Sequence, residues 1–267
     1  MSSSTATTGS AGVQRELWGV RAQDWADAME GQMQPLYDAV LERIGVGQGT
    51  ELLDAGCGSG LAAQLAARRG AIVTGLDATP ELLAIARRRV PNGEFLEGDL
   101  ESLPFGDAAF DAVVGFNSFQ YAATPQTALA EAKRVARRGA PVVIATWAVP
   151  ERCEAAVYLS ALGPLMPPAP AGAPGPFALS APGALEELAT EAGLTPGDAD
   201  EVAFSWVYSD DESALRGLLA SGPAVKAIQT SGEQAVGDAA LASIAQFADD
   251  AGGYSIGAAF RYLVTTA

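Results

Sequence analysis

The chain lacks histidine altogether, and it has only two cysteines among its 267 residues. Without histidine it has no access to the commonest general base near neutral pH or to a frequent ligand of transition metals. Cys57 and Cys153 lie too far apart for a Cys-x-x-Cys motif, so the sequence predicts neither a metal site nor a disulfide framework. These absences exclude histidine-driven catalysis and leave no metal centre to expect.

Positive charge is also scarce, with 16 Lys and Arg against 32 Asp and Glu and a formal net charge of -16. Nucleic-acid binding normally needs a concentrated basic surface, so we expect no nucleic-acid partner. The two basic clusters, at residues 87–89 and 134–138, fall at the C-terminal ends of predicted helices. They are expected to be solvated helix ends that favour the helix dipole.

Long hydrophobic runs are missing as well. No segment approaches the about 18 apolar residues of a membrane-spanning helix. The Ser-, Thr- and Gly-rich start of the chain lacks the basic and apolar regions of a signal peptide. We therefore expect a cytoplasmic protein without a membrane partner, beginning with a disordered tail at residues 1–14.

The most informative stretch present is residues 51–60, in which a predicted strand supplied by Leu52 and Leu53 leads into a glycine-rich turn. Gly56, Gly58 and Gly60 remove Cβ atoms where the backbone and a ligand must approach closely, and an apolar helical face starts at Leu61. A dinucleotide fingerprint, G-x-G-x-x-G, would place the third glycine one position later. The turn therefore indicates a nucleoside-like ligand, but not a dinucleotide.

The pattern Asp54-x-Gly-x-Gly-x-Gly resembles motif I of the class I S-adenosylmethionine-dependent methyltransferases. Further strands at residues 71–76 and 94–97 each lead to a carboxylate, Asp77 and Asp99, in the order that the family shows. The resemblance implies that Asp77 holds the ribose and that the loop of Asp99 contacts the adenine. The resemblance covers residues 50–147. Within the family, the sequence is similar to the ubiquinone/menaquinone-methyltransferase branch. The resemblance implies that the cofactor is S-adenosyl-L-methionine. The residues that it implies for cofactor binding are Asp54, Gly56, Cys57, Gly58, Gly60, Asp77, Ala78, Asp99, Leu100, Phe116, Asn117 and Trp25.

The expected fold is a single α/β domain over residues 15–267. It is Rossmann-like and doubly wound, with a mostly parallel seven-stranded sheet, an antiparallel closing strand and helical lid insertions. The remaining strands are predicted at residues 110–116, 141–147, 201–208 and 254–265. The additions are an N-terminal helical cap at 15–48 and substrate-side insertions at 150–180 and 209–250, with a Pro-rich linker at 163–176 and a helix break at Gly222-Pro223.

These additions are rich in Ala, Leu, Pro, Phe and Trp, which favours a small, fairly apolar acceptor whose methylated atom is oxygen, nitrogen or carbon. Methyl transfer from a sulfonium can proceed largely by proximity and orientation. Tyr121 is the weak candidate for a catalytic group, and the alternative is that it only lines the pocket. The expected acceptor-side residues are Trp18, Gln120, Tyr121, Trp147 and Phe177.

Two alternatives stay open at this level. If the cofactor site serves another purpose, the chain is an S-adenosylmethionine-binding protein without methyl transfer, such as a sensor or a non-methylating enzyme. The insertion at 209–250 is a homodimer contact if it is not a lid. Trp25 likewise either folds over the cofactor or belongs to an ordinary packing helix.

Overall fold

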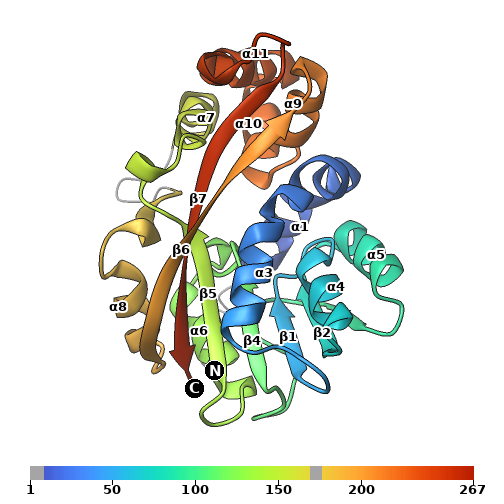
Figure 1. Cartoon of the computed structure of the whole chain (residues 1–267), viewed down its shortest axis with the longest axis vertical. Helices are drawn as coiled ribbons and strands as arrows, with labels where there is room; N and C mark the ends of the chain where they lie inside the picture. Colours follow the sequence, from blue (N-terminus) through green and yellow to red (C-terminus); the bar gives the residue numbers. More distant parts are fainter. Residues whose placement is uncertain (1–8, 169–175) are drawn as a thin grey trace, which may run out of the picture.

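A seven-stranded sheet forms the centre of the molecule (Figure 1). The computed structural model describes residues 9–168 and 176–267. The strand order is β3-β2-β1-β4-β5-β7-β6, and only β7 runs antiparallel to its neighbours. The predicted mixed sheet is therefore confirmed. The strands are β1 Glu51–Ala55, β2 Ile72–Asp77, β3 Glu94–Glu97, β4 Ala112–Phe116, β5 Pro141–Trp147, β6 Thr195–Tyr208 and β7 Tyr254–Thr266.

The central strands are buried on both faces, which explains their continuous apolar runs. Leu52 and Val114 point into one core cluster, whereas their neighbours Leu53 and Val113 point into another. Residues of α3 and α4 join the first cluster, and residues of α6 and α8 join the second. The covering helices are α3 Gln34–Arg43, α4 Leu61–Arg68, α5 Pro80–Arg89, α6 Pro125–Val135 and α8 Ala184–Glu191.

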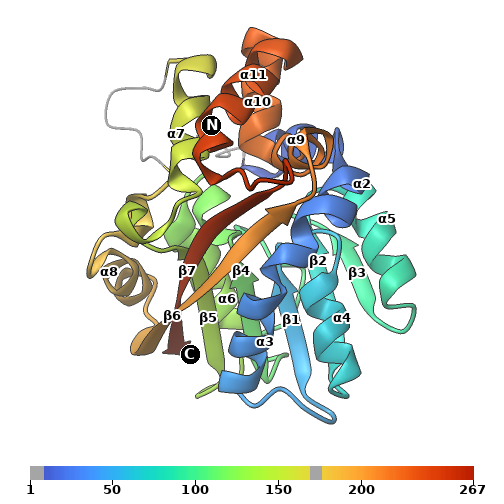
Figure 2. The same cartoon turned by 45° about the horizontal axis from the view of Figure 1, so that its top comes forward.

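The hairpin of β6 and β7 extends beyond the rest of the sheet and carries three helices at its far end (Figures 1 and 2). These are α9 Asp211–Leu218, α10 Gly222–Ser231 and α11 Glu233–Ile244. The helices are interrupted just before the expected break at Gly222-Pro223, but these two residues begin α10, a helix that the sequence did not predict. Proline fits the first helical turn, and the side chain of Ser221 accepts a hydrogen bond from the N–H of Ala224 at 3.4 Å.

The region before α8 contains a helix that sequence patterning does not predict, α7 Ala156–Leu162. It packs against α11 of the distant insertion. Half of the predicted Pro-rich linker, residues 169–175, lies outside the described residues.

The N-terminal cap starts earlier than expected, with α1 at Ala11–Gly19. Residues 11–14 are therefore helical and not part of a disordered tail, while residues 1–8 lie outside the described part of the chain. The N–H of Ala11 donates to Asp99 at 3.3 Å, which ties this helix to the sheet edge. The cap continues through α2 Ala22–Asp24, a π-helical turn at Trp25–Met29 and a 3-10 turn at Glu30–Met33.

The described helices include none that is both long enough and apolar enough to span a bilayer.

Candidate cofactor and acceptor site

A cavity of about 760 Å³ opens where the carboxyl ends of β1, β2 and β4 meet. Ligands of open α/β sheets bind at this edge, where the connections diverge to opposite faces. The cap helices close the other side of the cavity. Its lining residues are Ser10, Ala11, Gln14, Trp18, Trp25, Met33, Tyr37, Gly56, Gly58, Asp77, Ala78, Thr79, Leu82, Gly98, Asp99, Leu100, Phe116, Asn117, Ser118 and Tyr121.

The glycine loop forms one wall of this cavity. Gly56 has a φ of 80°, and a Cβ there would lie 2.4 Å from the Cβ of Ser118, so the turn requires glycine. Gly60 has a φ of 82°, and its Cβ would lie 2.7 Å from that of Ala86 on α5. Gly60 thus serves close packing of α4 on α5 and does not line the cavity. Cys57, a residue of the loop that was also expected at the cofactor, is buried and does not line the cavity.

Asp77 stands at the end of β2 in a fixed orientation. Its Oδ2 accepts a hydrogen bond from the N–H of Gly58 at 2.9 Å, and its Oδ1 accepts one from the N–H of Thr79 at 2.9 Å. Desolvation of the carboxylate nevertheless raises its pKa above the ordinary range. The contacts hold the carboxylate between the glycine loop and the start of α5, and each of its oxygens keeps a lone pair that these bonds do not use.

Asp99 lies across the cavity, after β3. One oxygen accepts from the N–H of Glu101 at 2.9 Å, and the other accepts from the N–H of Ala11 at 3.3 Å. Leu100 follows it in the lining. The two carboxylates that the sequence placed at strand ends are therefore brought to one cavity.

Asp54 lies beneath the loop and is 1% exposed. Its Oδ2 has no hydrogen-bond partner among the described residues. Burial, followed by the nearby carboxylates of Glu30 and Asp77, raises its pKa to about 8. A buried carboxyl group without a partner is costly, and it indicates a position kept for a donor that the protein itself does not supply.

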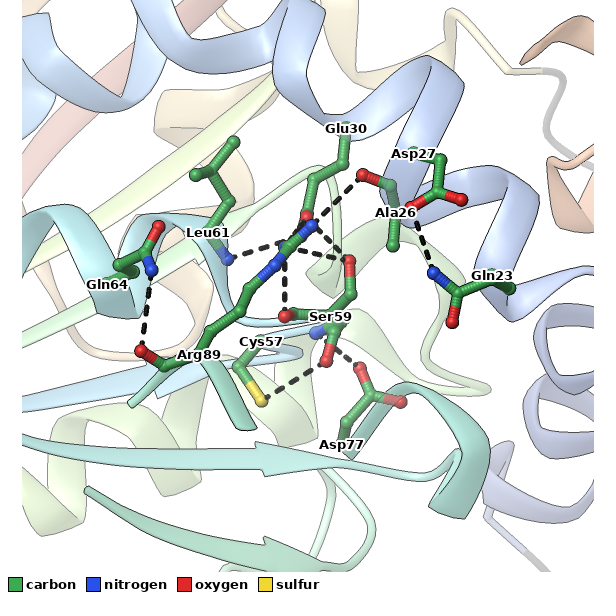
Figure 3. A network of polar contacts seen from close by, with 11 residues as sticks. Gln23, Ala26, Asp27, Glu30, Cys57, Ser59, Leu61, Gln64, Asp77 and Arg89 are labelled. Atoms are coloured by element: carbon green, nitrogen blue, oxygen red, sulfur yellow. Dashed lines mark hydrogen bonds and ion pairs between the residues drawn. The ribbon is translucent and has the colours of Figure 1, made fainter. Parts of the chain in front are cut away.

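A buried polar network connects the cap to the glycine loop (Figure 3). Glu30, 3% exposed, accepts from the hydroxyl of Ser59 at 2.5 Å and pairs with Arg89 at the end of α5. Arg89 also donates to the carbonyls of Ser59 and Ala26, each at 3.0 Å. Arg89 was expected at a solvated helix end, and that expectation is wrong because its guanidinium turns inward to the buried carboxylate of Glu30.

A second cavity of about 410 Å³ adjoins the first. The two share Trp18, Trp25, Met33, Asn117 and Tyr121 as lining residues. We call this second cavity the aromatic chamber. Its other lining residues are Met29, Trp147, Tyr158, Leu159, Trp206, Leu218, Ser221, Pro223 and Phe260.

The expected acceptor-side residues divide between the chamber and its surroundings. Trp18, Tyr121 and Trp147 line the chamber. Gln120 does not, and it donates a hydrogen bond to Asn117 instead. Phe177 packs against Trp147 from outside, with the ring centroids 5.9 Å apart.

Sequence reasoning missed several groups at this site. The missed lining residues of the first cavity are Ser10, Ala11, Gln14, Thr79, Leu82, Gly98 and Ser118. Glu30 and Arg89 were missed as well, and no local pattern announces their pairing. The chamber residues from the distal insertion, Leu218, Ser221 and Pro223, lie near the helix boundary that Gly222-Pro223 marks.

Comparison with known proteins identifies the kind of domain that contains this sheet edge. Residues 53–144 match the family described as a methyltransferase domain. Residues 53–144 carry a class I S-adenosylmethionine-dependent methyltransferase domain. The matched segment contains the glycine loop, Asp77 and Asp99, and the domain's cofactor is S-adenosylmethionine.

Relatives of the methyltransferase domain extend this match. An uncharacterized protein of Mycobacterium tuberculosis is 35% identical over 164 residues, which are 60% of this chain and 58% of the relative. The demethylmenaquinone methyltransferase of Tropheryma whipplei is 35% identical over 122 residues, 45% of this chain and 51% of that protein. The chain therefore spans only about half the length of the curated relatives that it matches.

Among solved structures, a SAM-dependent methyltransferase from Aquifex aeolicus superimposes with a TM-score of 0.55. It is 16% identical and covers 92% of this chain and 98% of its own. At this identity the likeness concerns the fold.

Proposed function

We propose that the chain transfers the methyl group of S-adenosylmethionine to a small, fairly apolar acceptor. The observation that carries the proposal is the pair of adjoining cavities. One contains the family's cofactor motifs, and the other is apolar and shares five lining residues with it. A methyl group at their junction would face an acceptor in the chamber.

The residues present suit the cofactor. We assign its ribose to Asp77, its adenine to the loop of Asp99 and Leu100, and its amino-acid end to the glycine loop above Asp54. The partnerless oxygen of Asp54 fits an ammonium donor, which would restore the hydrogen bond that this buried carboxylate lacks. The carboxyl groups of Glu30, Asp54 and Asp77 outnumber Arg89, so a ligand with positive charge favours the ionised form of Asp54.

When bound, S-adenosylmethionine supplies an electrophilic methyl group and a neutral leaving thioether. The protein's part is then to bind, align and exclude water. Trp18 packs edge-on against Trp25 and Tyr121, with ring centroids 5.0 and 5.8 Å away, and so forms a stiff wall at the junction. Fixing an acceptor against such a wall is the source of proximity catalysis.

Tyr121 does not suit the role of a general base. Burial raises the pKa of its hydroxyl to about 12, so the phenol is neutral near physiological pH. A neutral phenol can donate a hydrogen bond or orient an acceptor, but it takes up a proton poorly. We therefore propose that Tyr121 positions the acceptor.

Within this function, we also propose that the chain belongs to the ubiquinone/menaquinone-methyltransferase branch. Its support is the Tropheryma relative named as a demethylmenaquinone methyltransferase, which covers less than half of this chain. The residues of the aromatic chamber, and not the name of this relative, support the acceptor class that we propose.

Calorimetry with S-adenosylmethionine, S-adenosylhomocysteine and NAD tests the cofactor assignment. We expect both sulfur ligands to bind and NAD to fail. Asp77→Asn should weaken both by roughly 2 to 3 kcal/mol, since it removes charge-assisted contacts. Asp107→Asn is a matched control, because Asp107 is exposed and only pairs with Arg134. Unchanged affinity in Asp77→Asn would overturn the ribose assignment.

The alternative is a binding protein without methyl transfer. Adding an acceptor library to the cofactor-loaded protein separates the two functions. Release of S-adenosylhomocysteine is expected for a methyltransferase. Cofactor binding with no release for any acceptor would favour the sensor.

A further inference from the structure

The aromatic chamber carries a specific chemistry. Seven of its fourteen lining residues are aromatic, and none of the fourteen has a charged side chain. The rings of Trp147 and Phe260 lie 4.3 Å apart at 33°, and Trp206 meets Trp147 edge-on at 5.8 Å. Aromatic walls of this kind favour a flat ring, which can make offset or edge contacts on each side.

One residue that lines the chamber, Trp206, has a polar group without a partner in the part of the chain that the structure describes. Trp206 is 1% exposed, and its indole N–H has no hydrogen-bond partner among the described residues. Two other polar groups of the lining are engaged: the hydroxyl of Tyr158 donates to the carbonyl of Leu218 at 2.6 Å, and the N–H of Trp18 donates to Gln14 at 3.1 Å. A buried donor without a partner is expensive, so a ligand that carries an acceptor atom toward Trp206 would recover that cost.

The lining also contains no general base. The nearest motif carboxylates, Asp77 and Asp99, line the first cavity and already accept backbone hydrogen bonds. The chamber tyrosines are held neutral, since burial raises the pKa of Tyr121 and Tyr158. An acceptor that reacts through oxygen must therefore lose its proton to solvent before it is enclosed.

We propose that the chamber takes a flat, conjugated acceptor with a carbonyl oxygen that accepts a hydrogen bond from Trp206 and an acidic enol or phenol hydroxyl that reacts as its anion. This inference rests on the proposed methyl transfer and names the acceptor class of the same site. A delocalised anion loses less solvation energy in an apolar chamber than a localised carboxylate does.

The reaction balances without any further reagent. The hydroxyl proton goes to solvent, and the resulting oxygen anion forms the new O–CH₃ bond. The S–CH₃ bond breaks, and its electron pair stays on sulfur as a neutral thioether. Anion and sulfonium thus become two neutral products, a change that a low-dielectric, uncharged chamber favours.

Direct binding to the protein saturated with S-adenosylhomocysteine tests the proposal without turnover. The probes are 4-hydroxycoumarin, an acidic enol with a ring carbonyl, 2-naphthol, a weaker acid without one, 1-naphthoate, a localised anion, and 1-naphthylamine. We expect 4-hydroxycoumarin to bind at least about tenfold more tightly than the other three. With S-adenosylmethionine, mass spectrometry should find its methyl ether.

Trp206→Phe keeps a ring in the wall and removes the N–H. It should reduce the preference for 4-hydroxycoumarin over 2-naphthol by about tenfold. Trp147→Phe makes the same change elsewhere in the wall and should leave that preference intact. Thermal unfolding checks that both variants fold, and cofactor calorimetry checks that the first cavity is unchanged.

Several outcomes overturn the proposal. Equal binding of all probes, tighter binding of 1-naphthoate or 1-naphthylamine, or an unchanged preference in Trp206→Phe would each do so while cofactor binding still stands. If the protein fails to bind S-adenosylhomocysteine, the proposed function fails and this acceptor class fails with it.

Discussion

Single residues at the cofactor edge are arranged for ligand binding and not for the stability of the free protein. Asp54 is buried without a partner for one oxygen, and Glu30 and Asp77 lie close enough to raise its pKa further. The only cation in this network is Arg89, which pairs with Glu30. Such clustering of buried carboxyl groups costs stability and is typical of functional sites.

The raised pKa of Asp54 predicts a pH dependence of stability. The folded protein keeps this proton up to about pH 8, whereas the unfolded chain releases it near the ordinary value of 3.8. The free energy of unfolding should therefore fall as pH rises between these values, by at most about 1.4 kcal/mol per pH unit from this group. Asp54→Asn should flatten that slope and stabilise the ligand-free protein near pH 8, as measured by urea unfolding across the pH range.

The same variant should bind the cofactor less well. In the wild-type protein, cofactor affinity should rise with pH toward about 8 as Asp54 ionises to meet the ammonium. A wild-type slope of stability that persists unchanged in Asp54→Asn would show that other groups produce it.

Sequence predicts some of these residues well and others not at all. Asp54, Asp77 and the glycine turn are local features, because each stands next to a strand whose apolar run is visible. Glu30 and Arg89 are 59 residues apart in the chain, and neither has a neighbour that marks it. Arg89 shares its helix end with Arg87 and Arg88, which are exposed, so only the packed structure distinguishes it.

At the scale of elements, two of the polar contacts that join the cap to the rest of the domain lie on either side of the glycine loop. Arg89 connects α5 to the π-helical turn through Ala26 and to Glu30, while Asp99 holds the start of α1. The glycine loop lies between these points and is bonded to Glu30 through Ser59. The order of the cap and of the loop should therefore depend on one network.

Arg89→Gln should loosen both segments together. It leaves the buried carboxylate of Glu30 without its cation, which costs roughly 3 kcal/mol. Hydrogen exchange should accelerate at residues 22–33 and 56–61 in particular. Arg88→Gln, an exposed change one residue earlier, should have no such effect. Faster exchange spread evenly over the whole chain would indicate general destabilisation and not a local link.

The distal insertion packs onto the cap and the chamber. A Cβ at Gly222 would lie 2.7 Å from the indole nitrogen of Trp18. The inner faces of α9, α10 and α11 contribute Ala214, Ala224 and Ala240 to the main core cluster. The lid and homodimer interpretations both remain predictions, but removal of the whole insertion would expose this core.

Gly222→Ala is a gentler test of the insertion than deletion. The added methyl group must displace Trp18 at the wall shared by both cavities, so acceptor affinity should fall about tenfold. Cofactor affinity should change by only a few fold. Gly237→Ala, on α11, is the control, because its Cβ would make an ordinary 3.5 Å contact with Leu215. Equal effects of the two substitutions would argue against a role of the insertion in the chamber.

At the scale of the whole molecule, the succession of predicted strands and helices along the chain predicted the sheet but not the aromatic chamber. The alternation of apolar strands and amphipathic helices leaves few topologies, so the mixed seven-stranded sheet could be expected. The chamber combines residues as distant as Trp18, Tyr121, Trp206 and Phe260. Their meeting depends on how far the β6–β7 hairpin extends and where its helices pack, which no local pattern specifies.

We propose that the whole molecule moves a methyl group from S-adenosylmethionine to a small acceptor. The most direct measurement uses S-adenosylmethionine with a trideuterated methyl group and follows 4-hydroxycoumarin and the acceptor library by mass spectrometry. We predict one acceptor product that carries the three deuterium atoms, formed in equal amount with S-adenosylhomocysteine and lost in Asp77→Asn. Tight cofactor binding with no deuterated product from any small acceptor would contradict the account.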